Sequence, residues 1–290
     1  MRAAAVQLNS TEDKDRNLAT AERLTHAAAA DGADLVVLPE KFNVLGTHEH
    51  YEAGAEALDG PTIGWARDLA RELGIDLVAG SIVERREGRD RLGNTSVHVG
   101  PEGDLRGVYR KIHMFDVTVD GKEYRESTSQ EAGGEVVTSE AEGARLGLTV
   151  CYDLRFPELY RILAIRGARI LIVPAAFTRH TGQAHWDTLL RARAIENQAF
   201  VIAADQVGVH PPDNESFGGS QILDPWGDLL AHAPEYSPAL TPGARDALRP
   251  GECFVAADLD LGRQDEVRES LPSLANRVPS AYKWPQEAQV

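Results

Sequence analysis

Apolar positions group into short runs and helical stripes along most of the chain. Residues 3–8 and 35–38 have the composition of buried strands, and Pro39 ends the second run. Thr11 is the expected N-cap of a helix between them, and Gly32 its expected end. Along this helix the apolar residues recur every three or four positions at Leu18, Ala21, Leu24 and Ala28. A strand, a helix and a strand in this order predict parallel pairing of the two strands.

The same alternation continues to about residue 260. The pattern predicts further helices over residues 62–73, 157–166 and 184–197. It predicts further strands over residues 76–83, 146–150, 170–173, 200–204 and 254–259. Two strand pairs flank turn sequences and predict hairpins, 95–99 with 105–109 and 220–223 with 229–231. Residues 116–134 are polar and irregular, which is typical of a loop over a site.

This order of elements predicts an α/β fold with two mixed sheets packed face to face and helices outside. No Pro/Gly/Ser-rich linker divides residues 1–290, so we expect one domain with its core in about residues 1–260. The tail, residues 261–290, is polar with scattered apolar side chains and is expected to pack on a surface or a partner. Its apolar residues include Leu271, Leu274, Val278 and Trp284.

Composition narrows the class of protein. The chain has 290 residues, is 42% hydrophobic and carries a formal net charge of −15. The negative charge argues against nucleic acid or an anionic membrane as a partner. The longest apolar runs, such as residues 170–174, are too short to span a bilayer, and the N-terminus lacks a signal-peptide pattern. We therefore expect a soluble, cytoplasmic protein.

Two cysteines cannot form a disulfide framework, and neither belongs to a CxxC pair, so a structural zinc site is not expected. Cys253 lies in a plain strand-like run and is expected in the core. Cys151 directly follows the apolar run 146–150, and a thiol in that position can be a nucleophile.

Three reactive residue types follow predicted strands. Glu40 follows residues 35–38, Lys111 follows 105–109, and Cys151 follows 146–150. Ligand sites of open α/β sheets gather at the carboxyl ends of strands, so these side chains could converge. Taken singly, each has a simpler interpretation: a buried apolar cysteine, a surface carboxylate and an ion-pairing lysine.

Together the three residue types suit amide hydrolysis. A thiolate can attack the carbonyl carbon, and a glutamate can take the thiol proton and return it to the leaving amine. A lysine ammonium and a backbone N–H can hold the negative oxygen of the tetrahedral intermediate. The expected roles are Cys151 as nucleophile, Glu40 as general base and Lys111 as oxyanion stabiliser.

Three segments resemble motifs of the nitrilase superfamily, the carbon–nitrogen hydrolases. These are Leu38-Pro39-Glu40, Tyr109-Arg110-Lys111-Ile112-His113-Met114-Phe115-Asp116 and Cys151-Tyr152-Asp153-Leu154-Arg155-Phe156-Pro157-Glu158. The resemblance covers about residues 5–260. It implies a four-layer α-β-β-α sandwich, no metal or organic cofactor, and a homodimer or higher homo-oligomer.

Other segments, including residues 176–186, 190–198 and 224–227, are similar to the Nit amidase branch of that superfamily. The branch includes deaminated glutathione amidase and omega-amidase. The resemblance implies hydrolysis of a small carboxylate-bearing (2-oxo acid) amide through a cysteine thioester. An N-carbamoyl amino acid hydrolase or another aliphatic amidase of the superfamily is the alternative.

The resemblance also implies further site residues. Glu126 matches a second active-site glutamate, although it could be a surface charge of its loop. The backbone N–H of Tyr152 would complete the oxyanion hole. Arg155, Phe177 and Thr181 match residues that line the substrate pocket, and Arg155 could bind a substrate carboxylate. Arg155 could instead form an ion pair with Glu158 or Asp153.

Two features depart from the branch. Lys41 follows Glu40, at a position where a hydrophobic or small residue is more usual. If its side chain points into the site, it would pair with Glu40 and weaken that base. If its side chain points to solvent, it would change nothing. Residues 208–217 have no family match and could set entry to the pocket.

Two other classes of function compete with the amidase. A Cys–His hydrolase would use a histidine as base, with His113 nearest by motif. A serine hydrolase of the nucleophile-elbow type is disfavoured, because the chain has no GxSxG. A non-catalytic binding protein would lack one of the three reactive residues, whereas Glu40, Lys111 and Cys151 are all present.

Overall fold

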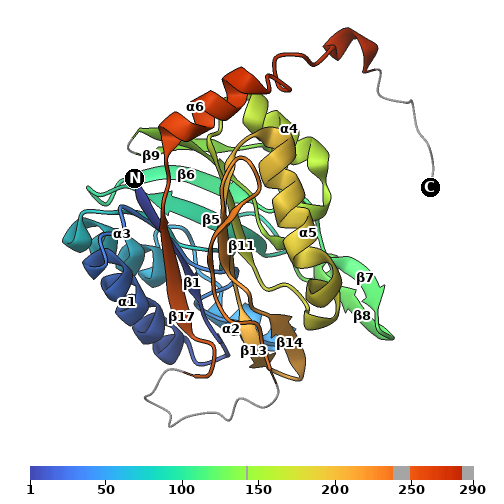
Figure 1. Ribbon diagram of the computed structural model, residues 1–290. Coiled ribbons are helices and arrows are strands. Elements are labelled where there is room, and N and C mark those ends of the chain that lie inside the picture. Colours follow the sequence, from blue (N-terminus) through green and yellow to red (C-terminus); the bar gives the residue numbers. More distant parts are fainter. Residues whose placement is uncertain (142, 238–248, 283–290) are drawn as a thin grey trace.

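A computed structural model describes residues 1–141, 143–237 and 249–282 (Figure 1). Two mixed sheets form its centre. The first sheet has the order β17-β1-β2-β3-β5-β4, with β6 paired to β5, and the second has the order β16-β15-β12-β11-β10-β9. The strands of the first are β1 (Arg2–Gln7), β2 (Leu35–Val37), β3 (Asp76–Val78), β4 (Ile82–Glu84), β5 (Gly93–Val99), β6 (Leu105–Arg110) and β17 (Cys253–Asp258).

The second sheet contains β9 (Thr138–Ala141), β10 (Ala144–Leu148), β11 (Ile170–Ala175), β12 (Phe200–Asp205), β15 (Gln221–Leu223) and β16 (Leu229–His232). Parallel pairs hold β1 to β2, β2 to β3, β10 to β11 and β11 to β12, as strand-helix-strand order predicts. The carboxyl ends of these strands therefore lie along one edge of each sheet.

Helices cover the outer face of each sheet (Figure 1). The helices are α1 (Lys14–Ala30), α2 (His48–Gly54), α3 (Pro61–Leu73), α4 (Pro157–Ile165), α5 (Arg179–Asn197) and α6 (Leu261–Ser270). Ala4 and Val6 of β1 pack in one apolar cluster with α1 and α3, whereas Ala3 and Ala5 face the second sheet. This period of two buries both faces of β1, and the predicted four-layer α-β-β-α sandwich is confirmed.

The sequence pattern located most elements but erred at several boundaries. Asp13, rather than Thr11, caps α1 by accepting the backbone N–H of Arg16 at 3.1 Å. The strand predicted over residues 76–83 divides into β3 and β4 at Gly80. Gly80 adopts a φ of +40°, and a Cβ there would lie 1.9 Å from the Pro39 carbonyl oxygen, so the chain must turn at a glycine.

The prediction of an irregular loop over residues 116–134 was wrong. This segment contains the hairpin of β7 (Asp116–Val119) and β8 (Lys122–Arg125), followed by the short helix η1 (Glu126–Thr128). Asp120 and Gly121 both have positive φ in its two-residue turn, and Asp-Gly between alternating residues is a strong hairpin signal. Residues 208–217 also form a hairpin, β13 (Val207–His210) with β14 (Asn214–Phe217).

The tail and Cys253 differ from the sequence-based expectation of a tail without a predicted helix and of a core cysteine. The tail contains a helix, α6, that the pattern did not predict, and η3 (Pro279–Ala281) follows it. Leu271 and Val278 are more than half exposed, and Trp284 lies outside the described residues. Cys253 is only partly buried. Within residues 1–141, 143–237 and 249–282, none of the helices combines the length and apolar character needed to span a bilayer.

Candidate active site

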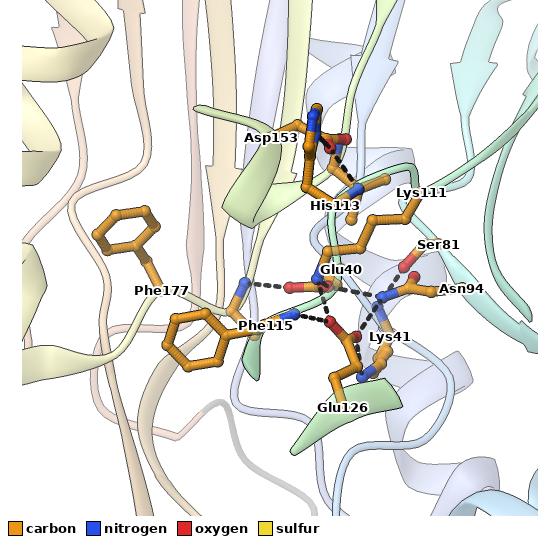
Figure 2. A network of polar contacts seen from close by, with 12 residues as sticks. Glu40, Lys41, Ser81, Asn94, Lys111, His113, Phe115, Glu126, Asp153 and Phe177 are labelled. Atoms are coloured by element: carbon orange, nitrogen blue, oxygen red, sulfur yellow. Dashed lines mark hydrogen bonds and ion pairs between the residues drawn. The ribbon is translucent and has the colours of Figure 1, made fainter. Parts of the chain in front are cut away.

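The three reactive side chains meet in one cavity of about 340 Å³. Glu40 lies just beyond β2, Lys111 directly after β6, and Cys151 beyond β10 at the first position of the short helix η2 (Cys151–Arg155). Lys111 Nζ donates to Glu40 Oε1 at 3.0 Å, and both side chains are almost fully buried (Figure 2). The convergence expected from the strand ends is therefore present.

The Glu40 carboxylate is held by neighbours on three sides. Asn94 Nδ2 donates to Oε1 at 2.7 Å, and the backbone N–H of Ala176 donates to Oε2 at 2.9 Å. These bonds come from both sheets, since Asn94 lies on β5 and Ala176 follows β11. These bonds orient Glu40 and leave Oε2 with room to accept a further hydrogen bond.

The Cys151 thiol is protonated in the resting site. Its burial raises the pKa well above the usual value, and the Glu40 carboxylate raises it further. The Lys111 ammonium and the backbone N–H of Ala176 oppose this rise without reversing it. A buried thiol of raised pKa needs a base at the moment of attack, and Glu40 is the carboxylate that hydrogen-bonds it.

Cys151 adopts a φ of +50°, in the left-handed region that non-glycine residues rarely occupy. Asp153, fully buried, stabilises this turn by accepting the Val150 N–H at 2.8 Å and the Tyr109 hydroxyl at 2.6 Å. Tyr109 precedes Lys111 by two residues, so the same carboxylate fixes the nucleophile turn relative to the lysine segment.

Glu126 points into the site, as the family motif implied. Its Oε2 accepts Lys111 Nζ at 2.8 Å and the Phe115 N–H at 2.9 Å. Its Oε1 accepts Lys41 Nζ at 3.1 Å and Asn94 Nδ2 at 3.2 Å. Burial would raise the pKa of Glu126, but the charges of Lys111 and Lys41 outweigh it and hold the pKa far below the usual range. Glu126 is therefore an ionised carboxylate with every oxygen occupied.

Lys41 points inward, yet its partner differs from the one expected. Its ammonium pairs with Glu126 rather than directly with Glu40, and lies 4.7 Å from the centre of the Tyr51 ring. Burial would lower the pKa of Lys41, but Tyr51, Glu126 and Glu40 together raise it above the usual value. The lysine is therefore charged.

The predicted substrate-binding residues line one side of the cavity. Tyr152, Arg155, Phe177 and Thr181 all contribute to its wall. The Arg155 guanidinium lies 5.1 Å from the centre of the Phe177 ring, and its Nη1 donates to His185 Nδ1 at 3.2 Å. Among the described residues no carboxylate forms an ion pair with Arg155, so the alternative pairing with Glu158 or Asp153 is absent there.

His113 is engaged elsewhere. Its Nδ1 bonds Asp153 Oδ1 at 2.7 Å, and its ring stacks on Phe156 with 3.6 Å between centres. Figure 2 shows His113 with Asp153 apart from the cluster around Glu40 and Lys111. This arrangement gives the Cys–His hypothesis no support from its nearest candidate.

Sequence reasoning missed one contributor to the site. Asn94 bridges the two glutamates, and the signal for it was a polar amide within a strand buried along its whole length. The β13–β14 hairpin adds His210, Pro212, Asn214, Glu215 and Ser216 to the cavity wall, in agreement with the suggestion that residues 208–217 set entry to the pocket. In the described part of the chain, no cluster of His, Cys, Asp and Glu has a metal-binding arrangement.

The model of the carbon–nitrogen hydrolase family matches residues 2–248. The chain belongs to this family. A deaminated glutathione amidase of Synechocystis sp. is 40% identical over 95% of the hydrolase and 97% of its own length. The human omega-amidase NIT2 is 35% identical over 97% of the hydrolase and 96% of its own length.

The crystal structure of the C. elegans NitFhit protein superposes with a TM-score of 0.85 and 34% identity, covering 97% of the hydrolase and 66% of that chain. These comparisons confirm the resemblance to the nitrilase superfamily and its Nit branch. They make the protein a hydrolase that acts on amides.

Proposed function

We propose that the hydrolase cleaves a small amide that carries a carboxylate group, through a thioester on Cys151. The observation that carries the proposal is the Arg155 guanidinium, which lies at the cavity wall with no carboxylate partner among the described residues. A planar guanidinium recognises a carboxylate with two parallel hydrogen bonds. The names of the relatives, deaminated glutathione amidase and omega-amidase, support an amide of this class.

The first half of the reaction forms the thioester. The Cys151 sulfur attacks the amide carbon while Glu40 takes the thiol proton. The oxygen of the tetrahedral intermediate is stabilised by the Lys111 ammonium and by the backbone N–H of Tyr152 at the start of η2. Glu40 then returns the proton to the nitrogen, the carbon–nitrogen bond breaks, and ammonia or an amine leaves.

The second half consumes one water molecule. Glu40 takes a proton from water as the water oxygen attacks the thioester carbon. The carbon–sulfur bond breaks, the thiol regains its proton, and the carboxylic acid departs. Glu126 stays ionised throughout, since four donors occupy its oxygens. In this scheme it orients Lys111 and transfers no proton.

A substrate panel tests the proposal. Carboxylate-bearing amides (2-oxoglutaramate, 2-oxosuccinamate and deaminated glutathione), N-carbamoyl amino acids, neutral aliphatic amides and nitriles are assayed for released ammonia or amine. We expect the carboxylate-bearing amides to have the highest kcat/KM. A preference for N-carbamoyl amino acids would favour the alternative branch, and turnover of nitriles alone would contradict the amidase.

The nucleophile is tested by Cys151→Ala, with Cys253→Ala as the matched control. We expect Cys151→Ala to lower kcat by at least about 10³-fold, as removal of a nucleophile does in other acyl-transfer enzymes. Circular dichroism should show an unchanged fold for both variants. Full activity of Cys151→Ala would end the proposal.

Carboxylate recognition is tested by Arg155→Met, with Arg161→Met on α4 as control. Loss of a charged hydrogen bond predicts a fall of about 10- to 100-fold in kcat/KM for carboxylate-bearing amides. Neutral amides should be affected little. An equal loss for both substrate classes would mean that Arg155 does not read the carboxylate.

We also propose that the hydrolase is a cytoplasmic homodimer. Exposed apolar side chains on adjacent elements support an interface, among them Ile165 of α4, Ile195 of α5 and Trp226 in the β15–β16 turn. Light scattering should give twice the chain mass of 31.5 kDa, and Trp226→Glu should shift the mass toward the monomer. A wild-type monomer would contradict the dimer, and cell fractionation tests the location.

A further inference from the structure

Lys41 occupies a backbone conformation that is unfavourable for lysine. Its φ is +51°, in the left-handed region that non-glycine residues rarely adopt. Its N–H donates to Ser81 Oγ at 2.9 Å, which ties the turn after Glu40 to the turn between β3 and β4. The side chain is 9% exposed and lines the cavity. A glycine would suit this backbone better, so the side chain itself needs an explanation.

The ammonium of Lys41 is committed to Glu126. The Nζ–Oε1 distance is 3.1 Å, and Figure 2 shows Lys41 on the far side of Glu126 from Lys111. The Gln130 amide contacts both partners of this pair. In the orientation that satisfies its hydrogen bonds, its nitrogen donates to Glu126 Oε1 at 3.1 Å and its oxygen accepts from Lys41 Nζ at 3.2 Å. One carboxylate thus lies between two buried ammonium groups.

Charge balance follows from this arrangement. Two carboxylates, Glu40 and Glu126, face two ammonium groups, Lys41 and Lys111, in a region closed to most solvent. Without Lys41 the group would carry a net charge of −1, which is costly in a low-dielectric cavity. Lys111 would then be the one cation among the three remaining groups, shared by both glutamates, and less of its charge would act on the thiol and the oxyanion.

We propose that Lys41 is a positioning residue that neutralises and holds Glu126, so that Lys111 faces the reacting carbonyl and Glu40 is the one carboxylate free to move protons. The inference rests on the proposed function, because it assigns a division of labour between two glutamates of the same site. It also explains how a cavity with two buried carboxylates can admit an anionic amide.

Loss of Lys41 should therefore make the thiol of Cys151 harder to ionise. The groups that face the thiol or the lysine from neighbouring elements are Glu40, Lys111, Glu126, Tyr51 and Tyr160. Removing one positive charge from this set favours the protonated forms of the remaining groups. Thiol reactivity at a fixed pH should fall, and the pH at which reactivity appears should rise.

Alkylation by iodoacetamide tests this without any substrate. The rate of carboxamidomethylation of Cys151, followed by peptide mass spectrometry, is measured from pH 6 to pH 10 in wild type, Lys41→Met, Lys41→Arg and Lys14→Met. Lys14 also forms an ion pair, with Glu56, and does not line the cavity, so it is a matched control. We expect Lys41→Met to react about 10-fold more slowly at pH 8, with the profile displaced to higher pH, and Lys41→Arg and Lys14→Met to stay within about twofold of wild type.

Steady-state kinetics separate positioning from a merely structural role. Lys41→Met should lower kcat for every amide, and should raise KM more for carboxylate-bearing amides than for neutral ones. A profile of Lys41→Met that matches wild type, or a Lys41→Arg profile displaced as far as that of Lys41→Met, overturns the inference. Should Lys41→Met fail to fold, Lys41→Gln carries the same test. Failure of the amidase proposal would appear separately: wild type would turn over no amide, while the alkylation profiles of wild type and Lys41→Met would still differ as expected.

Discussion

Buried ionisable side chains decide the chemistry of this hydrolase at the scale of single residues. The raised pKa of the Cys151 thiol means that attack on the amide depends on Glu40 rather than on a preformed thiolate. The lowered pKa of Glu126 removes a second carboxylate from proton transfer. Two glutamates close to one lysine therefore have different roles because their hydrogen-bond partners differ.

His210, at the edge of the cavity, makes the stability of the protein depend on pH. Its Nδ1 bonds the Ser10 carbonyl oxygen at 2.7 Å, while its buried Nε2 has no partner among the described residues. Burial lowers the pKa of His210 to about 4, against the opposing effect of the Ser10 bond. The folded state therefore keeps a neutral imidazole at pH values where the unfolded chain has bound a proton.

This difference has a definite sign. Well above pH 6.5 neither state is protonated at His210, and the residue adds no pH dependence. As the pH falls from 6.5 to 4, the unfolded state gains a proton first, so the free energy of unfolding should fall by up to about 3 kcal/mol.

His210→Asn keeps a donor for Ser10 without titrating, and its free energy of unfolding should fall less over this range. Urea denaturation at pH 7.5, 5.5 and 4.5 measures the difference, with His26→Asn as control; parallel curves for wild type and His210→Asn would contradict the assignment.

At the scale of elements, the β7–β8 hairpin connects the lysine segment to Glu126. The hairpin starts after Phe115, whose N–H donates to Glu126, and ends at Arg125, immediately before Glu126. It forms a separate two-stranded sheet outside the two central sheets. Its conformation should therefore matter to the site more than to global stability.

Gly121→Val tests this connection, because Gly121 has a φ of +73° in the hairpin turn. A β-branched residue there costs roughly 1–2 kcal/mol, which predicts a fall of about 5- to 30-fold in kcat/KM. The same backbone cost should lower the melting temperature by about 2 to 8 °C in this variant and in its control alike. Gly88→Val is the matched control: it has a φ of +70° and equal space for a side chain, but it lies outside the β7–β8 hairpin, between β4 and β5. Equal activities of the two variants would show that the hairpin does not support Glu126.

At the scale of the whole molecule, the charge of the chain as a whole differs from the charge around the cavity. The chain carries 45 acidic and 30 basic side chains, a net charge of −15. The cavity is different, because five of its lining residues are lysine or arginine (Lys41, Lys111, Lys122, Arg125, Arg155) and four are glutamate (Glu40, Glu123, Glu126, Glu215). An anionic substrate is thus repelled by the surface on average but meets balanced charge inside the cavity.

Self-repulsion of the acidic surface predicts that salt stabilises the folded state. Raising NaCl from 20 to 500 mM at pH 7.5 shortens the Debye length from about 20 Å to a few ångströms. Relief of repulsion should raise the melting temperature by about 2 to 4 °C for each kcal/mol gained. Near pH 5.0, the isoelectric point, the rise should vanish. A melting temperature that falls with salt at pH 7.5 would mean that screened ion pairs outweigh the net charge.

The sequence by itself determined the layers and the chemistry. Period-two and helical apolar spacing decide which faces are buried, so the four-layer sandwich and most of its strands could be predicted. The residues after three strands could be named because strand ends in such sheets face one edge, and family motifs named Glu126, Arg155, Phe177 and Thr181. The β7–β8 hairpin also has a local signal, because Asp120-Gly121 is a dipeptide that favours a two-residue hairpin turn.

Only the tertiary structure decided which charges pair. Lys41 lies 85 residues from Glu126 in the chain, and Asn94 lies 54 residues from Glu40, so no local pattern indicates either contact. The choice between Glu40 and Glu126 as partner of Lys41 depends on the direction of the turn after Glu40, which the bond from the Lys41 N–H to Ser81 Oγ holds. Ion pairing depends on distance in space, which the fold sets, whereas burial periodicity is a local property that the chain carries before it folds.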